Sequence, residues 1–139
     1  MRIAALYDIH GNLPALEAVL REIRREAIDL VMVGGDVLPG PMPRETLRCL
    51  LDLDRPVQFI RGNGESEVLA QRTGSDTAAL SESVRAVLRW TAQQLHPEDE
   101  QEVAGWPPTR RAEVDGLGDV LFCHATPRND TEIFTRRTS

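Results

Sequence analysis

The sequence predicts an α/β protein in which a mainly parallel sheet is flanked by helices and followed by a hairpin that begins a second sheet. Three apolar runs, at residues 2–7, 30–33 and 57–60, have the length and hydrophobicity of buried parallel strands. An amphipathic stretch separates the first two, as in a βαβ unit with a right-handed crossover. The chain is long enough to bury a core, and residues 1–139 are expected to form a single domain.

The stretch after the first strand has the features of an amphipathic helix. Asn12 is a favourable N-cap, and Pro14 lies in the first turn, where its missing N–H does no harm. Apolar residues then recur at helical spacing: Leu13, Leu16, Val19, Leu20, Ile23 and Ala27. The second strand ends at Gly34-Gly35, and the proline-rich segment 38–43 is expected to be a loop over the strand ends.

The remaining chain predicts further helices, a hairpin and a polar tail. Helices are expected at residues 44–53, 83–95 and 98–103, with a helical turn at 66–72 that breaks at 73–76. Two strands, 109–114 and 120–123, are expected to pair through a turn at 115–118, and residues 125–139 look like a loop or a tail. Both tryptophans, Trp90 and Trp106, are expected to cover the edge of the core rather than to stack on a base.

Composition excludes several classes of protein. The net charge of −6 argues against an extended nucleic-acid surface, and no apolar run reaches the length of a membrane span. Two cysteines are too few for a disulfide framework, so a reduced, cytoplasmic setting is expected. All sixteen basic residues are arginine, which excludes a P-loop nucleotidase because that motif requires a lysine. A haloacid-dehalogenase-type phosphatase would also need a lysine, and a second Asp where His10 stands.

Metal-ligand residue types follow each predicted strand. Asp8 and His10 follow the first strand, Asp36 the second and Asn63 the third, while His124 follows the last strand of the hairpin. Each motif alone has an ordinary explanation, because Asp and Asn cap helices, Gly-Asp and Gly-Asn make turns, and a lone His is commonly structural. Together they place oxygen and nitrogen ligands where open α/β sheets bind their ligands. This mixture suits a pair of divalent metal ions.

The order of these motifs resembles the calcineurin-like metallophosphoesterase superfamily, particularly its small bacterial and archaeal members. That pattern is Asp-x-His, Gly-Asp, Gly-Asn-His-Asp/Glu, a lone His and then Gly-His-x-His, and the run at residues 8–18 is especially typical. The resemblance extends from Met1 to about Pro127, roughly the first half to two thirds of a family domain. It implies an incomplete form of the family's β-sandwich with flanking helices.

The resemblance also implies a role for each site residue. Asp8 and His10 would hold one metal, Asn63 and His124 the other, and Asp36 would bridge the two. The ions would be manganese, iron or zinc, and a hydroxide bound to them would attack phosphorus. Asp36, Asn63 and His124 are therefore the expected catalytic residues.

Two further residues are candidate contacts to a small phosphoester substrate. Arg61 could meet a phosphate, although a surface arginine that caps a loop is an equal alternative. Asn12 is the second candidate. Glycine at position 64 replaces the family's histidine, which is thought to protonate the leaving group, and Asn12 or Glu65 could partly substitute for it.

The sequence also lacks the Gly-His-x-His motif, which leaves each metal three protein ligands at most. The second sheet would be only begun, so uncovered apolar faces could lead to a homo-oligomer. A truncated product, a frameshifted gene or a shortened chain completed by a partner would each explain this. The predicted activity is hydrolysis of phosphodiesters or nucleotide-like phosphates. The alternative is a degenerate or truncated family member that binds metal, phosphate or a protein partner without catalysis.

Overall fold

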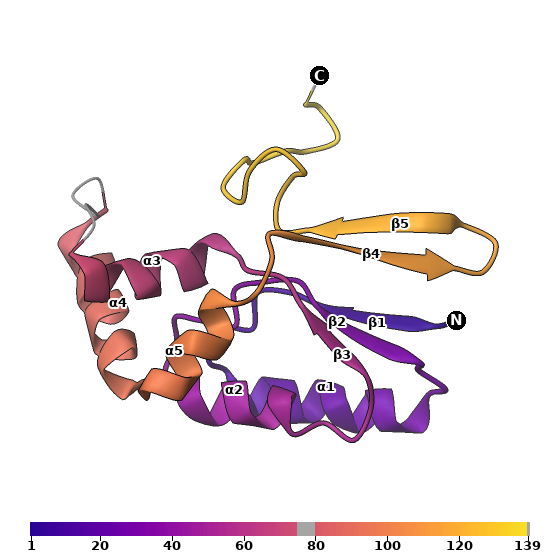
Figure 1. Cartoon of the computed structure of the whole chain (residues 1–139), viewed down its shortest axis with the longest axis horizontal. Helices are drawn as coiled ribbons and strands as arrows, with labels where there is room; N and C mark the ends of the chain where they lie inside the picture. The colour runs from indigo at the N-terminus through magenta and orange to yellow at the C-terminus, as the bar shows by residue number, and fades with distance from the viewer. Residues whose placement is uncertain (75–79, 139) are drawn as a thin grey trace.

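A computed structural model describes residues 1–74 and 80–138 and confirms the α/β class (Figure 1). Three parallel strands form the first sheet in the order β1-β2-β3, with bounds β1 Ile3–Leu6, β2 Leu30–Val33 and β3 Val57–Phe59. The hairpin follows as a separate antiparallel sheet, with β4 at Thr109–Val114 and β5 at Gly118–Cys123. These strands lie within one or two residues of the predicted ends.

The helices among the described residues are α1 Leu13–Arg25, α2 Pro43–Leu51, α3 Asn63–Thr73, α4 Glu82–Gln94 and α5 Pro97–Ala104. Figure 1 shows α1 and α2 along one face of the parallel sheet, the hairpin on the opposite side, and α3, α4 and α5 grouped beyond the strand ends. None of the helices among the described residues has the length and apolar content that crossing a bilayer requires.

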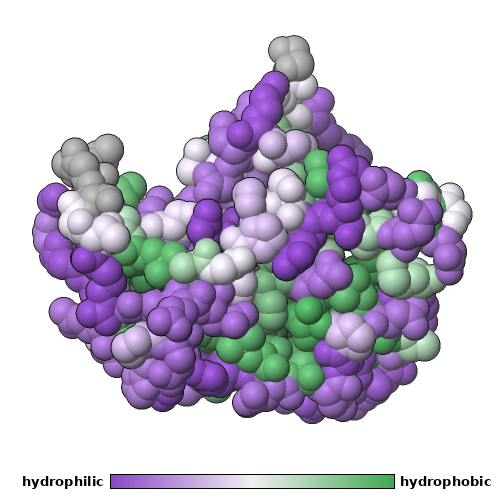
Figure 2. All heavy atoms as spheres, in the orientation of Figure 1, coloured by the Kyte–Doolittle hydropathy of each residue, from purple (hydrophilic) through white to green (hydrophobic). Residues whose placement is uncertain are grey.

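Strand β2 forms the centre of the core because both of its faces are covered. Val31 and Val33 pack with apolar residues of α1 and α2, whereas Leu30 and Met32 pack on the side of the hairpin, near Ala112. The alternation follows from the strand's two-residue period. Figure 2 shows apolar residues gathered across the middle of the viewed face, about where β3 lies in Figure 1.

The prediction for the third helix was wrong at its start. The helical turn expected at residues 66–72 is an eleven-residue helix that begins at Asn63 and ends before Gly74, which has a left-handed φ of 68°. Part of the predicted break, residues 75–76, lies outside the described residues. Gly62 is the N-cap, whereas Gly64 lies inside the first turn and disfavours the helix by propensity; tertiary contacts described below outweigh that preference.

The expectation for the tryptophans was right for one of them. Trp106 is buried and stacks on Phe59, with ring centroids 4.5 Å apart. Trp90 lies on α4 with 43% of its surface exposed, so unlike Trp106 it is not buried at the edge of the core.

Candidate metal centre

The site forms where the chain leaves β1 and β2. Backbone hydrogen bonds continue between the two segments beyond the strand ends, because Asp8 N–H donates to the Gly35 carbonyl at 3.2 Å and His10 N–H to the Asp36 carbonyl at 2.9 Å. Asp8, His10 and Asp36 all have positive φ values, of 53°, 47° and 55°. Non-glycine residues rarely adopt this backbone conformation, and it is typical of functional loops.

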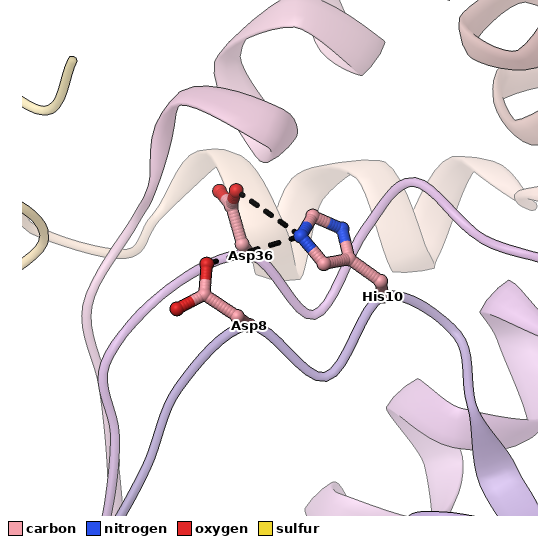
Figure 3. Close-up of side chains that lie close together, drawn as sticks. All are labelled: Asp8, His10 and Asp36. Atoms are coloured by element: carbon pink, nitrogen blue, oxygen red, sulfur yellow. Dashed lines mark ion pairs between the residues drawn. The ribbon is translucent and has the colours of Figure 1, made fainter.

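Asp8, His10 and Asp36 converge on one point (Figure 3). One ligand atom from each of the three lies within 4.8 Å of the others. His10 Nε2 is 3.8 Å from Asp8 Oδ1 and 3.6 Å from Asp36 Oδ2. These separations are too long for hydrogen bonds, but atoms that bind one ion at about 2.0–2.2 Å lie roughly this far apart. The donor set therefore fits a divalent metal ion.

The two oxygens of Asp36 face two different imidazoles. Oδ2 faces His10, while Oδ1 lies 3.6 Å from Nε2 of His124, which follows the hairpin. Oδ1 also accepts a hydrogen bond from Gly64 N–H at 2.8 Å. A carboxylate placed in this way can bind two ions at once, because each of its two oxygens can bind one of them.

Backbone carbonyls orient both imidazoles in the same way. His10 Nδ1 lies 3.3 Å from the Pro39 carbonyl, and His124 Nδ1 lies 2.9 Å from the Gly34 carbonyl. Because a carbonyl oxygen only accepts, each Nδ1 donates its proton to the carbonyl, and each Nε2 is directed toward Asp36. A hydrogen bond of this kind fixes the tautomer of metal-binding histidines.

The buried carboxylate of Asp36 favours binding of a cation at this site. The Asp36 side chain is almost fully buried, and burial raises the pKa of its carboxyl above the ordinary value, although the Gly64 N–H partly opposes this effect. A buried carboxylate is costly unless a positive charge balances it. A metal ion in contact with Asp36 would provide it.

Glu65 holds the backbone around this site, a role that the sequence did not reveal. Its buried carboxylate accepts hydrogen bonds from the N–H groups of Asp36, Leu38 and Gly62, at 2.9, 2.9 and 2.8 Å. Burial raises its pKa, while the backbone donors oppose that shift. The suggestion that Glu65 replaces the missing imidazole is wrong, because its side chain is buried and engaged with three backbone donors.

Asn63 is the remaining predicted metal ligand, and its role stays a prediction. It is the first residue of α3, between Gly62 and Gly64, and its carboxamide nitrogen donates to Glu67 Oε1 at 3.4 Å. The Gly64 N–H bond places this end of α3 beside Asp36.

The two candidate substrate contacts, Asn12 and Arg61, have structural partners. Asn12 Oδ1 accepts from Ala15 N–H at 3.2 Å and caps α1, as predicted from the sequence. Arg61 Nη1 donates to the carbonyl of Ala104, at the end of α5, at 3.3 Å. Arg61 therefore caps the end of helix α5 rather than a loop, and substrate contact by either residue stays a prediction.

Gly64 is required by a close approach of the backbone. A Cβ atom added there would lie 2.1 Å from the Leu38 carbonyl oxygen and 3.0 Å from Asp36 Oδ1. The loop after β2 therefore occupies the position from which the histidine of the resembled family would project.

We expect Gly64→Ala to lower the free energy of unfolding by about 1–3 kcal/mol, because the added methyl group collides with a backbone oxygen. Helix propensity alone predicts the opposite sign, a gain of about 0.5–1 kcal/mol. Urea unfolding measures the difference. Gly105→Ala is the comparison variant, since its added Cβ would meet a backbone oxygen at 3.3 Å, a contact that a shift of a few tenths of an ångström relieves. A stabilising Gly64→Ala would contradict the close approach.

Known proteins share this sequence over only part of their length. An uncharacterized protein of Methanocaldococcus jannaschii is 29% identical over 129 residues, which cover 91% of this chain and 50% of that protein. A symmetrical bis(5'-nucleosyl)-tetraphosphatase of Pseudomonas fluorescens is 28% identical over 125 residues, which cover 78% of this chain and 43% of that enzyme. The chain thus spans half or less of the length of these curated relatives.

Solved structures share the fold. A metallophosphoesterase from Sphaerobacter thermophilus superimposes with a TM-score of 0.67 at 31% identity, covering 94% of this chain and 48% of that one. A hypothetical protein from Pyrococcus horikoshii superimposes with a TM-score of 0.82 at 22% identity, covering 92% and 56% of the two chains. The family model of the calcineurin-like phosphoesterases matches residues 1–137, and the chain belongs to that family.

Proposed function

We propose that this protein hydrolyses phosphodiesters or nucleotide-like phosphates with the help of two divalent metal ions. The observation that carries the proposal is Asp36, whose two carboxylate oxygens each face the Nε2 atom of a different, tautomer-locked histidine. Family membership supports the same chemistry.

Five residues would hold the ions. Asp8 and His10 would bind one, Asn63 and His124 the other, and Asp36 both. When bound, two such ions would supply positive charge for a phosphate group and would lower the pKa of a bound water molecule. The chain's own contribution is to fix the ligands, through the carbonyls of Pro39 and Gly34 and through Glu65.

Nucleotide-like substrates are favoured by the relatives. Two curated relatives, from Pseudomonas fluorescens and Pseudomonas syringae, are named symmetrical bis(5'-nucleosyl)-tetraphosphatases. Their names describe substrates with nucleosides attached to a phosphate chain. We therefore place nucleotide esters and anhydrides first among the candidate substrates.

A direct test measures hydrolysis of bis-p-nitrophenyl phosphate with added manganese, iron or zinc. The proposal expects turnover that requires the added ion and disappears with a chelator. Binding of the same ions is measured separately by calorimetry. An absence of both turnover and ion binding would contradict the proposal.

We also expect the rate to depend steeply on the leaving group. Position 64 carries no imidazole, and general acid catalysis contributes roughly 10²–10⁴-fold. Aryl diesters and nucleotide anhydrides, whose leaving groups are acidic, should therefore react far faster than alkyl esters. Measuring kcat for a series of aryl esters of graded leaving-group pKa tests this. A flat dependence would count against it.

Binding without catalysis is the second candidate. It is favoured by Gly64, where the Leu38 carbonyl fills the space from which a leaving-group acid would project. This alternative expects calorimetric ion binding that Asp36→Asn removes, with no turnover of any ester in the series.

A further inference from the structure

An apolar cavity lies beside the metal centre, between α4 and the loop that follows Asp36. Its volume is about 580 Å³, and Gly40, Pro41, Ala86, Val87 and Trp90 line it. That volume falls within the range of small-molecule pockets. All five lining residues are apolar, so the cavity offers no charged side chain to a ligand.

The loop that lines one side of this cavity also contacts the metal centre. The Pro39 carbonyl that orients His10 belongs to the residue before Gly40. Gly40 packs directly against the backbone of His10, because a Cβ atom added to it would lie 1.8 Å from the His10 carbonyl oxygen. Two residues of chain span at most about 7 Å, so Pro41 lies within that distance of Pro39.

Helix α4 presents apolar side chains away from the core as well as toward it. Leu88 and Ala92 are buried in the core. Val84, Val87 and Trp90 follow one another at three-residue spacing and are 41%, 47% and 43% exposed. Three large apolar side chains along one exposed helix face are more than the scattered single residues of an ordinary surface.

We propose that this cavity binds the aromatic group of the substrate, a nucleobase or an aryl ring, while its phosphate lies at Asp8, His10 and Asp36. The inference rests on the proposed function and names the substrate class more closely. The indole of Trp90 offers a flat face for stacking, which every base can use. Among the lining residues, Trp90 alone carries a polar side-chain group, its indole N–H, so the cavity offers little that could distinguish the hydrogen-bonding edges of different rings. The protein should therefore accept purine and pyrimidine esters with similar KM values.

The first test uses fluorescence and needs no catalysis. The sequence has two tryptophans, so the Trp106→Phe protein carries Trp90 alone. AMP and phenyl phosphate should quench its fluorescence saturably in the presence of zinc, whereas ribose 5-phosphate, which lacks a ring, should not. Equal effects of AMP and ribose 5-phosphate would overturn the inference.

The second test is kinetic and uses bis-p-nitrophenyl phosphate. Trp90→Ala should raise KM roughly 5- to 150-fold, the range expected for loss of one stacking contact, with a smaller change in kcat. Trp90→Phe should restore most of the lost affinity. Val84→Ala is the matched control, because Val84 is exposed on the same helix but does not line the cavity.

The outcomes separate the two proposals. Metal-dependent turnover with an unchanged KM in Trp90→Ala overturns the cavity assignment and leaves the proposed function standing. Ring-specific quenching without turnover of any ester supports the cavity assignment and contradicts the proposed function. Self-association that Trp90→Ala abolishes, seen by sedimentation without ring-specific quenching, would show that a second copy covers the face and would overturn the inference.

Discussion

Replacing Asp36 with asparagine should remove metal-dependent hydrolysis while leaving the metal-free protein at least as stable as the wild type. The substitution keeps the shape of the side chain and an oxygen for the Gly64 N–H, but it removes the negative charge between His10 and His124. Loss of groups that only orient metal ligands typically lowers metal affinity 10- to 100-fold. Loss of a shared ligand should lower it by at least about 100-fold. Calorimetry with manganese or zinc measures this directly.

The expected difference in stability between Asp36→Asn and the wild type depends on pH. Burial raises the pKa of Asp36 in the folded protein. A group whose folded pKa is raised stabilises the fold below its unfolded pKa, near 3.8, and loses that contribution as pH rises through the folded value. At pH 7 the wild-type protein without metal therefore carries an unfavourable buried charge that Asp36→Asn lacks. The stability advantage of the variant should shrink as the pH falls toward 4.

Asp54→Asn serves as the control for the metal-affinity and the stability measurements. Asp54 lies on the surface with its side chain 76% exposed, so its replacement should change neither metal affinity nor the pH dependence of unfolding. Unchanged metal affinity in Asp36→Asn would show that this carboxylate is not a ligand. A variant much less stable than the wild type at pH 7 would contradict the argument from burial.

The strands and most helices could be predicted because they depend on local patterns. The continuous apolar run of β2 and the helical spacing of α1 identify both elements from the sequence. The start of α3 could not be predicted in this way, because Gly62 and Gly64 are typical of a turn. That helix begins where Glu65 accepts a hydrogen bond from Asp36 N–H and Asp36 accepts one from Gly64 N–H. The partners in these two bonds are separated by 29 and 28 positions in the sequence.

Four of the residues predicted as metal ligands lie close together, whereas the backbone groups that orient them were not foreseen. Asp8, His10, Asp36 and His124 lie together as their positions after strands imply. The carbonyls that orient the two histidines come from segments 29 and 90 residues away and carry no side-chain signature. The role of such a carbonyl cannot be predicted from a sequence, because every residue has one.

Glu65→Ala should be the most destabilising single substitution at this site. It leaves the buried N–H groups of Asp36, Leu38 and Gly62 without their acceptor. An unsatisfied buried donor costs about 1–3 kcal/mol, so a loss of about 3–6 kcal/mol is expected. Domains of this size are stable by roughly 5–15 kcal/mol, so the variant should be close to unfolding at 37 °C. Chemical unfolding followed by circular dichroism measures the loss.

Glu65→Gln separates packing from charge. Its single carbonyl oxygen can take the place of Oε2, which serves Asp36 and Gly62, but its amide nitrogen then faces the N–H of Leu38. We therefore expect an intermediate loss of stability and a 10- to 100-fold lower metal affinity, because the loop that carries Asp36 is held less firmly. Glu22→Ala, on the exposed face of α1, should cost less than about 0.5 kcal/mol. If Glu65→Ala proved as mild as Glu22→Ala, the three backbone hydrogen bonds could not be what holds Asp36 in place.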